Sequence, residues 1–126
     1  MVKFDHMTLP VSDVRRSRDW YVNNLGFKIE FERAGISAIQ DSAGFTIFLR
    51  KATKRLVGDK VTLTIQLKSV DRTHAKLSKN GLKFVNSPQP LFWGYGAELE
   101  DLDGYMLNLW DQVTMRQATR ASKRAS

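Results

Sequence analysis

The residues best suited to chemistry lie on short segments in which polar and apolar side chains alternate. His6 lies on one such segment, residues 3–11, where its imidazole could act as a general base or as a metal ligand. Asn108 and Trp110 lie on another, residues 105–110, where an amide could hydrogen-bond a ligand and an indole could stack on it. The sequence contains no Cys, which excludes thiolate nucleophiles, thiolate zinc sites and disulfides.

Hydrophobic periodicity predicts the elements that position these residues, and the first half of the chain is predicted as a β-α-β-β-β module. Side chains alternate over residues 3–11, and Ser12 or Asp13 can cap a helix that runs to about Asn24. Gly26 follows as a left-handed C-cap. Three further strands are predicted at residues 27–33, 36–40 and 45–50.

The second half predicts the same order of elements after a polar linker at residues 51–60. The predicted elements are a strand at 61–67, a helix capped by Ser69 that runs to about Asn80 and ends at Gly81, and strands at 82–85, 95–100 and 105–110. The segment Ser87-Pro88-Gln89-Pro90 is expected to break the strand 82–85. The last turn, residues 101–104, combines a glycine with Asp side chains that can bond their own backbone.

The two halves align as a repeat, which takes precedence over local assignments. The matched pairs are His6 and Thr62, Val14 and Val70, Asp41 and Asp101, and Phe48 and Asn108. We therefore predict an α+β fold of two βαβββ repeats forming a curved mixed sheet, with helices on the outer face and a cup on the inner face. Residues 1–112 would form one domain, with modules at about 1–50 and 60–112, followed by a basic C-terminal tail at 113–126.

The predicted cup combines flat apolar side chains, hydrogen-bonding groups and one charge. The predicted ligand-binding residues are His6, Phe48, Arg50, Thr62, Thr64, Gln66, Trp93, Tyr95, Asn108 and Trp110. This mixture suits a planar organic ligand with polar edges. Alternatively, the aromatic side chains fill the sheet interface, and residues 105–110 form a core strand that is buried on both faces.

Short motifs follow one another along the chain in a set order. A strand that carries His6 leads into PVSDV (residues 10–14) and then WYVNNLGF (20–27), and Trp93-Gly94 precedes Asp101-Leu102-Asp103-Gly104. In this order the chain resembles, over about residues 3–111, the glyoxalase/bleomycin-resistance/extradiol-dioxygenase fold of the vicinal oxygen chelate superfamily. The late turn of that family is usually Asp-Pro-Asp-Gly-Asn, whereas Leu102 and Tyr105 stand here at the Pro and Asn positions.

The resemblance also implies a divalent metal in the cup, held by ligands on the first and last strands of each module. The corresponding positions are His6, Phe48, Thr62 and Asn108. Family ligands are usually His or Glu, sometimes Gln; Phe48 cannot coordinate, and Thr62 and Asn108 offer only neutral oxygens. We therefore expect no metal and no cofactor. Glu98 and Glu100 would reach the cup only through a shifted strand register.

Without the metal ligands, the resemblance implies a metal-independent small-molecule binding protein, which could sequester an antibiotic or another planar organic ligand. The alternative is an enzyme of the family, a lyase, isomerase or dioxygenase, with a divergent metal site or with His6 as the general base. His6 is the best candidate for a catalytic residue, and no other can be assigned.

The net charge of +7 favours a neutral or anionic ligand. Four cations, Arg116, Arg120, Lys123 and Arg124, lie in the tail, which has no acid and is expected to fray or to extend a terminal helix. Such a tail could contact nucleic acid, but the sequence has no recognition helix or RNA-binding signature, so nucleic-acid binding is not expected.

The compartment and the assembly are predicted from simpler features. Residues 1–11 lack the apolar core of a signal peptide, and no apolar run approaches the length of a membrane span, so a cytoplasmic protein without membrane contact is expected. Each module leaves a sheet edge that must be covered, and dimers are common in the family that the chain resembles. We therefore predict a homodimer.

Overall fold

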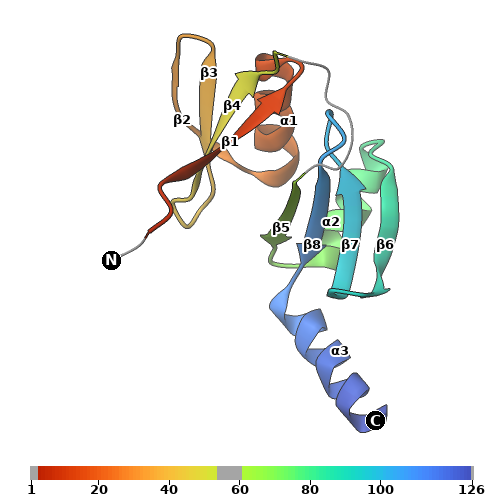
Figure 1. The fold of residues 1–126 in the computed structure, drawn as a ribbon. Coiled ribbons are helices and arrows are strands. Elements are labelled where there is room, and N and C mark those ends of the chain that lie inside the picture. Colours follow the sequence, from red (N-terminus) through yellow and green to blue (C-terminus); the bar gives the residue numbers. More distant parts are fainter. Residues whose placement is uncertain (1–2, 54–60, 126) are drawn as a thin grey trace. The chain divides into compact units, whose positions relative to one another are not determined.

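The computed structural model describes residues 3–53 and 61–125, and the chain divides into two compact units, residues 1–58 and 59–126 (Figure 1). Each unit contains one four-stranded mixed sheet with a helix packed on it, and a third helix follows the last strand. The predicted α+β fold of two βαβββ repeats is therefore confirmed.

The N-terminal unit consists of β1 (His6–Val11), α1 (Val14–Leu25), β2 (Lys28–Arg33), β3 (Ile36–Gln40) and β4 (Thr46–Lys51). Its strand order is β1-β4-β3-β2, with β1 parallel to β4 and the remaining pairs antiparallel. Residues 3–5, which the sequence placed in the first strand, precede β1 without pairing. The predicted linker at 51–60 lies mostly outside the described residues, and Lys51 still belongs to β4.

The C-terminal unit consists of β5 (Thr62–Gln66), α2 (Val70–Lys79), β6 (Phe84–Leu91), β7 (Gly94–Glu100), β8 (Met106–Trp110) and α3 (Gln112–Ala125). Its strand order, β5-β8-β7-β6, repeats that of the first unit, again with one parallel pair, β5 and β8. The register repeats too: Thr8 pairs with Phe48, and the matching Thr64 pairs with Asn108. This register confirms the repeat alignment that was derived from the sequence.

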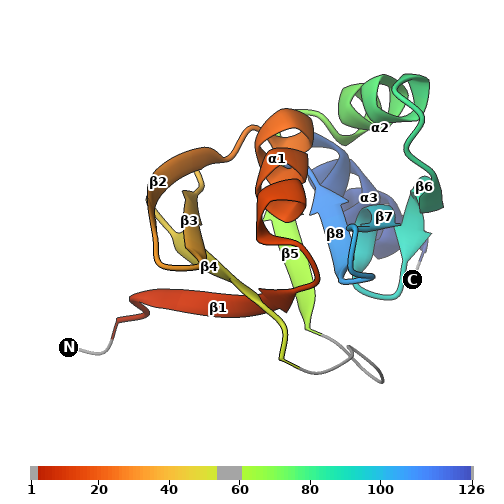
Figure 2. The same cartoon turned by 90° about the horizontal axis from the view of Figure 1, so that it is seen from above.

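In each unit, one face of the sheet packs against its helix. The helix α1 contacts β2, β3 and β4 (Figure 2), and the alternating residues Leu9, Val11 and Leu49 are fully buried. In the C-terminal unit α2 contacts β6 and β7, and Leu107 and Leu109 of β8 are fully buried. The alternation of a strand then directs the intervening residues to the opposite face. We call this opposite face the His6 face in the N-terminal unit and the Asn108 face in the C-terminal unit.

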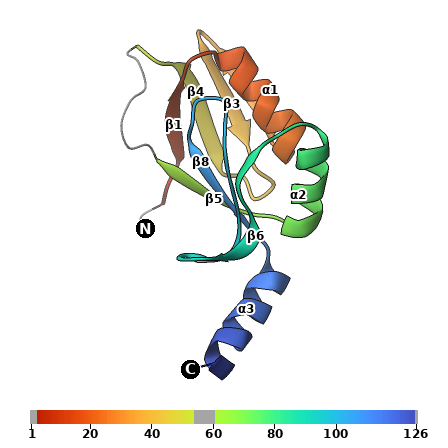
Figure 3. The same cartoon turned by 90° about the vertical axis from the view of Figure 1, so that its right-hand side faces the viewer.

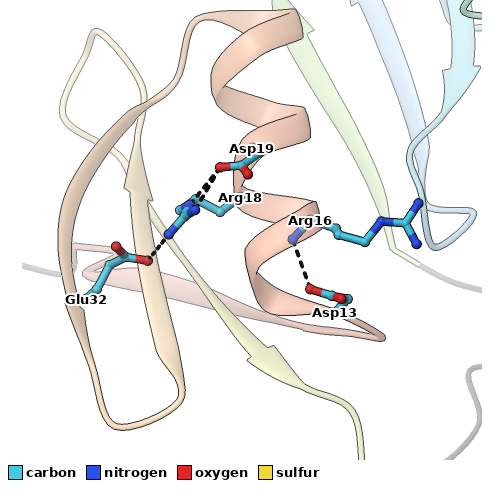
Figure 4. Close-up of polar contacts among 5 residues, drawn as sticks. All are labelled: Asp13, Arg16, Arg18, Asp19 and Glu32. Atoms are coloured by element: carbon cyan, nitrogen blue, oxygen red, sulfur yellow. Dashed lines mark hydrogen bonds and ion pairs between the residues drawn. The ribbon is translucent and has the colours of Figure 1, made fainter.

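Local hydrogen bonds place α1 as the sequence predicts. The side chain of Asp13 accepts a hydrogen bond from the backbone N–H of Arg16 (Figure 4). Gly26 ends the helix at a φ of 77°. Arg18 then links the helix to the sheet, because its guanidinium donates to Asp19 on α1 and to Glu32 on β2, the latter over 2.7 Å. The hydrogen bond from Arg18 holds the pKa of the Glu32 carboxyl below its ordinary value.

Asp111 joins three elements of the C-terminal unit. It follows β8 directly, and one carboxylate oxygen accepts from the backbone N–H of Val70, the first residue of α2, at 2.6 Å. The other oxygen accepts from the backbone N–H and the hydroxyl of Thr114 at the start of α3, both at 2.8 Å. Burial by itself would raise the pKa of Asp111, but these hydrogen bonds to the charged form outweigh it and lower the pKa.

The predicted break at residues 87–90 is wrong, because these residues belong to the strand β6. β6 continues to Leu91 through Pro88 and Pro90, where the sequence predicted a break. β6 is an edge strand and, among the described residues, pairs with β7 alone; an edge strand is a position where proline is tolerated within a sheet. The pairing shifts register twice, between Phe84 and Gln89, which accommodates the irregular backbone.

The basic tail forms a helix. α3 begins directly after β8 and Asp111 and extends past the strands of its unit (Figure 3). Met115 fixes its first turns to the sheet, since its sulfur lies 3.4 Å from the backbone nitrogen of Tyr95 and a Cβ on Gly94 would collide with it. None of the helices in residues 3–53 and 61–125 has both the length and the apolar character that crossing a membrane requires.

We expect Asp111→Asn to destabilise the protein by about 1–3 kcal/mol at neutral pH, because the amide nitrogen faces backbone donors that need an acceptor. The folded-state pKa of Asp111 is lowered, so its stabilising effect is present above the unfolded-state pKa and is lost as pH falls through the folded-state pKa. Urea unfolding over a pH series should therefore show the two proteins converging in acid. Glu100→Gln, which removes an exposed carboxylate from the same unit, is the control and should change little.

Candidate functional site

The His6 face carries a stack of aromatic rings. The imidazole of His6 lies on the ring of Phe48 at 3.9 Å between centroids and 18° between planes, and Nδ1 of His6 lies 2.8 Å from Asp5. Phe31 meets Phe48 edge to face at 5.5 Å, and the guanidinium of Arg33 lies over Phe31. The structure thus brings two predicted residues together and adds an aromatic and a cation that the sequence did not assign to the site.

Phe31 was missed because β2 is irregular. The pairing of β2 with β3 shifts register between Ile29 and Phe31, and Phe31 then pairs with Ala38 in the row of Phe48. Simple alternation would have kept Ile29 and Phe31 on one face. No sequence signal indicates this bulge, since none of the residues that surround it is a glycine or a proline.

The residues at the positions of the family's metal ligands do not fit a divalent ion. Phe48 occupies one position with an apolar ring that stacks on His6, the one imidazole among the four. Thr62 is exposed on β5, and Asn108 offers a neutral amide. In the described part of the chain, no three His, Asp or Glu side chains gather in a group that could hold a metal ion. Zinc and the other divalent ions of proteins need several imidazole, thiolate or carboxylate ligands.

Asn108 lies at the centre of the Asn108 face, on the strand between β5 and β7. It is 7% exposed, and its side-chain oxygen is buried without a hydrogen-bond partner among the described residues. Its cross-strand neighbours are Thr64 on β5 and Glu98 on β7. A buried carbonyl left without a donor costs about 1–3 kcal/mol.

Glu98 brings a carboxylate to the same face. One of its oxygens accepts from the side-chain amide of Asn86 at 2.6 Å, and the other accepts from the indole N–H of Trp93 at 3.2 Å. The sequence required a shifted register for Glu98 to reach the cup, whereas the register observed here pairs Glu98 directly with Asn108. Asn86 was missed altogether, because the sequence ended its strand at residue 85.

Trp93 folds back over β7 at Gly96. A Cβ on Gly96 would overlap the carbonyl oxygen of Leu109 and the ring of Trp93, so a larger residue cannot occupy this position without a shift. The close approach of the indole to the backbone puts Trp93 beside Glu98, where its N–H finds the carboxylate. The absence of a side chain at Gly96 therefore allows the indole ring of Trp93 to lie against β7.

The structure places the remaining predicted residues as follows. Thr62, Thr64 and Gln66 alternate on β5, are exposed, and pair in turn with Met106, Asn108 and Trp110 of β8. Arg50 is exposed at the end of β4. Tyr95 lies on the same face of β7 as the buried Ala97 and Leu99, so alternation places it on the side opposite Glu98 and the Asn108 face. Trp110 is half-buried and lines a groove with α3. The shared cup between the two modules stays a prediction.

Comparison with known proteins agrees with this fold. Residues 3–109 match the family model described as Glyoxalase/Bleomycin resistance protein/Dioxygenase superfamily. An uncharacterised protein of Shewanella frigidimarina is 30% identical, and the match covers 87% of this chain and 91% of the relative.

Two solved structures have the same fold. A member of this superfamily from Sphaerobacter thermophilus superposes with a TM-score of 0.74 at 23% identity, covering 88% of this chain and 98% of the other. TnmS3 from Streptomyces sp. CB03234, described as an antibiotic binding protein, superposes with a TM-score of 0.73 at 22% identity, covering 87% and 96%.

We expect Gly96→Ala to destabilise the protein by about 1–3 kcal/mol, because the added methyl group overpacks against the Leu109 carbonyl and the Trp93 ring. Chemical unfolding followed by circular dichroism measures the loss, and a change in the emission of Trp93 would accompany it. Glu100→Ala on the same strand adds no such contact and is the matched control. A Gly96→Ala protein as stable as the parent would contradict the close approach of the Leu109 carbonyl and the Trp93 ring to Gly96.

Proposed function

The chain belongs to the glyoxalase/bleomycin resistance protein/dioxygenase superfamily, and we propose that it is a metal-independent small-molecule binding protein. The site is the Asn108 face of the C-terminal unit. Its ligand is a planar organic molecule that donates a hydrogen bond to Asn108. The likeness in fold to TnmS3 supports the sequestering of an antibiotic as the form that this binding takes.

One observation carries the proposal, the buried side-chain oxygen of Asn108, which has no hydrogen-bond partner in residues 3–53 and 61–125. Leu107 and Leu109 anchor β8 in the core on either side of it, so the amide is held on a rigid strand. An acceptor left unsatisfied in the free protein becomes favourable once a ligand N–H or O–H reaches it. A ligand that lacks the donor would leave the oxygen buried and unpaired, and the site would discriminate against it.

The neighbours of Asn108 define the class of ligand. The carboxylate of Glu98 is held in place by Asn86 and Trp93, and it adds acceptor capacity next to Asn108. Two acceptors side by side favour a donor group on the ligand and disfavour an anion at this point. The indole of Trp93 supplies flat apolar surface beside them, which suits an aromatic ring.

We expect indole to bind the Asn108 face about tenfold more tightly than 1-methylindole, because the two rings differ only in the N–H donor that Asn108 can accept. Titration by ¹H–¹⁵N NMR measures both affinities and locates the ligand through the side-chain amide signals of Asn108 and Asn86. Equal affinities, or the absence of shifts at these amides with millimolar indole, would contradict the proposed site.

Asn108→Leu should remove the preference for indole over 1-methylindole, because leucine cannot accept a hydrogen bond. The free protein should be as stable as the parent or more stable, since a side chain of similar volume replaces a buried acceptor that has no partner among the described residues. Arg72→Gln changes an exposed residue of α2, outside the Asn108 face, and is the control, which should retain the preference. A purely structural role for Asn108 predicts the reverse, an Asn108→Leu protein that unfolds more readily.

A further inference from the structure

A groove of about 440 Å³ runs along the first half of α3 in the C-terminal unit. It is lined by Trp110, Gln112, Met115, Arg116, Thr119 and Arg120. Trp110 comes from the end of β8, and the other five residues come from α3. Met115 contacts Gly94 and Tyr95 and so holds α3 against β7. This contact fixes the position of α3 relative to the strands of its sheet.

Two unpaired cations border this groove. Arg116 and Arg120 are one helical turn apart, a spacing that brings their side chains to the same side of α3. Neither forms an ion pair with a carboxylate among the described residues, unlike Arg18, which is held by two. The sequence after Asp111 contains no Asp or Glu to neutralise them. The groove therefore combines positive charge with the indole and thioether surfaces of Trp110 and Met115.

We propose that this groove is a second binding site and that it takes an aromatic carboxylate. The ring of the ligand stacks on Trp110, and its carboxylate pairs with the guanidinium groups of Arg116 and Arg120. A guanidinium matches a carboxylate with two parallel N–H donors, and a partly apolar groove strengthens this interaction over that in bulk water. The proposal goes beyond the donor-binding site at Asn108 and uses none of Asn86, Trp93 and Glu98, although Trp110 lies on the same face of β8 as Asn108.

The lining of the groove favours an aromatic acid over the phosphate backbone of a nucleic acid. A nucleic acid is recognised chiefly by a run of cations along its backbone, and its affinity falls steeply with salt. Among the described side chains two guanidinium groups line the groove, together with the indole of Trp110 and the thioether of Met115. An aromatic acid matches this lining, because its flat apolar ring suits Trp110 and Met115 and its carboxylate suits the two arginines.

Calorimetric titration with 2-naphthoate and with 2-naphthamide, which has the same ring but no charge, tests the site. We expect the parent protein to bind 2-naphthoate at least tenfold more tightly than 2-naphthamide. The double substitution Arg116→Gln/Arg120→Gln should remove this tenfold preference, and glutamine retains a helix propensity close to that of arginine, so α3 should persist by circular dichroism. Trp110→Leu should weaken both compounds by the same factor.

Arg72→Gln/Lys76→Gln is the matched control, because it removes two exposed cations with the same spacing from α2 of the same unit. It should leave the preference for 2-naphthoate unchanged. The proposal is overturned if the two compounds bind equally, if the control loses the preference as fully as the α3 variant, or if millimolar 2-naphthoate does not bind. It is also overturned if a short DNA duplex binds more tightly than 2-naphthoate and depends on the same two arginines, since the groove would then serve nucleic acid.

Discussion

The position of β8 in the middle of its sheet is the constraint on which the C-terminal unit depends. β8 pairs with β5 on one side and with β7 on the other, and Leu107 and Leu109 are fully buried on the side that α2 covers. Because side chains alternate along a strand, Asn108 between them must point to the opposite face. The same core packing that stabilises the unit therefore turns toward this face a buried amide oxygen that has no hydrogen-bond partner among the described residues.

The two units use the same framework for different surfaces. At matching positions on the last strand, one unit carries Phe48 and the other carries Asn108, and their β-sheet partners are Ala38 and Glu98. The N-terminal face is consequently a stack of rings on His6, whereas the C-terminal face is a set of acceptors. Because Phe48 and Asn108 occupy the positions of family metal ligands, the two faces offer different groups to a ligand: aromatic rings on one and hydrogen-bond acceptors on the other.

The elements that local signals specify were predictable. The capping residues Asp13 and Ser69 accept the expected backbone hydrogen bonds, and Gly26 takes up the left-handed conformation that ends α1. The Asp41 and Asp101 side chains accept hydrogen bonds within their own turns. Each of these caps and turns depends on residues a few positions apart, so the local sequence is enough to predict it.

Features that depend on a pairing partner were not predictable. β6 passes through two prolines because it lies at the edge of the sheet, and only the assembled sheet shows which strand is the edge. Glu98 joins the site because β7 pairs with β8 in one register, and Asn86 joins it because β6 extends beyond the predicted break. Periodicity gives the faces of a strand, but the neighbour of each residue across the sheet comes from register.

We propose that the superfamily fold serves in this protein to bind an organic ligand without a metal. Native mass spectrometry of the protein, purified without added metal or chelator, tests this most directly because one spectrum reports both metal and organic adducts. We expect the mass of the chain, alone or with an organic adduct, and no divalent ion in fixed stoichiometry. One tightly held divalent ion per chain would contradict it, since His6, Phe48, Thr62 and Asn108 could not supply its ligands.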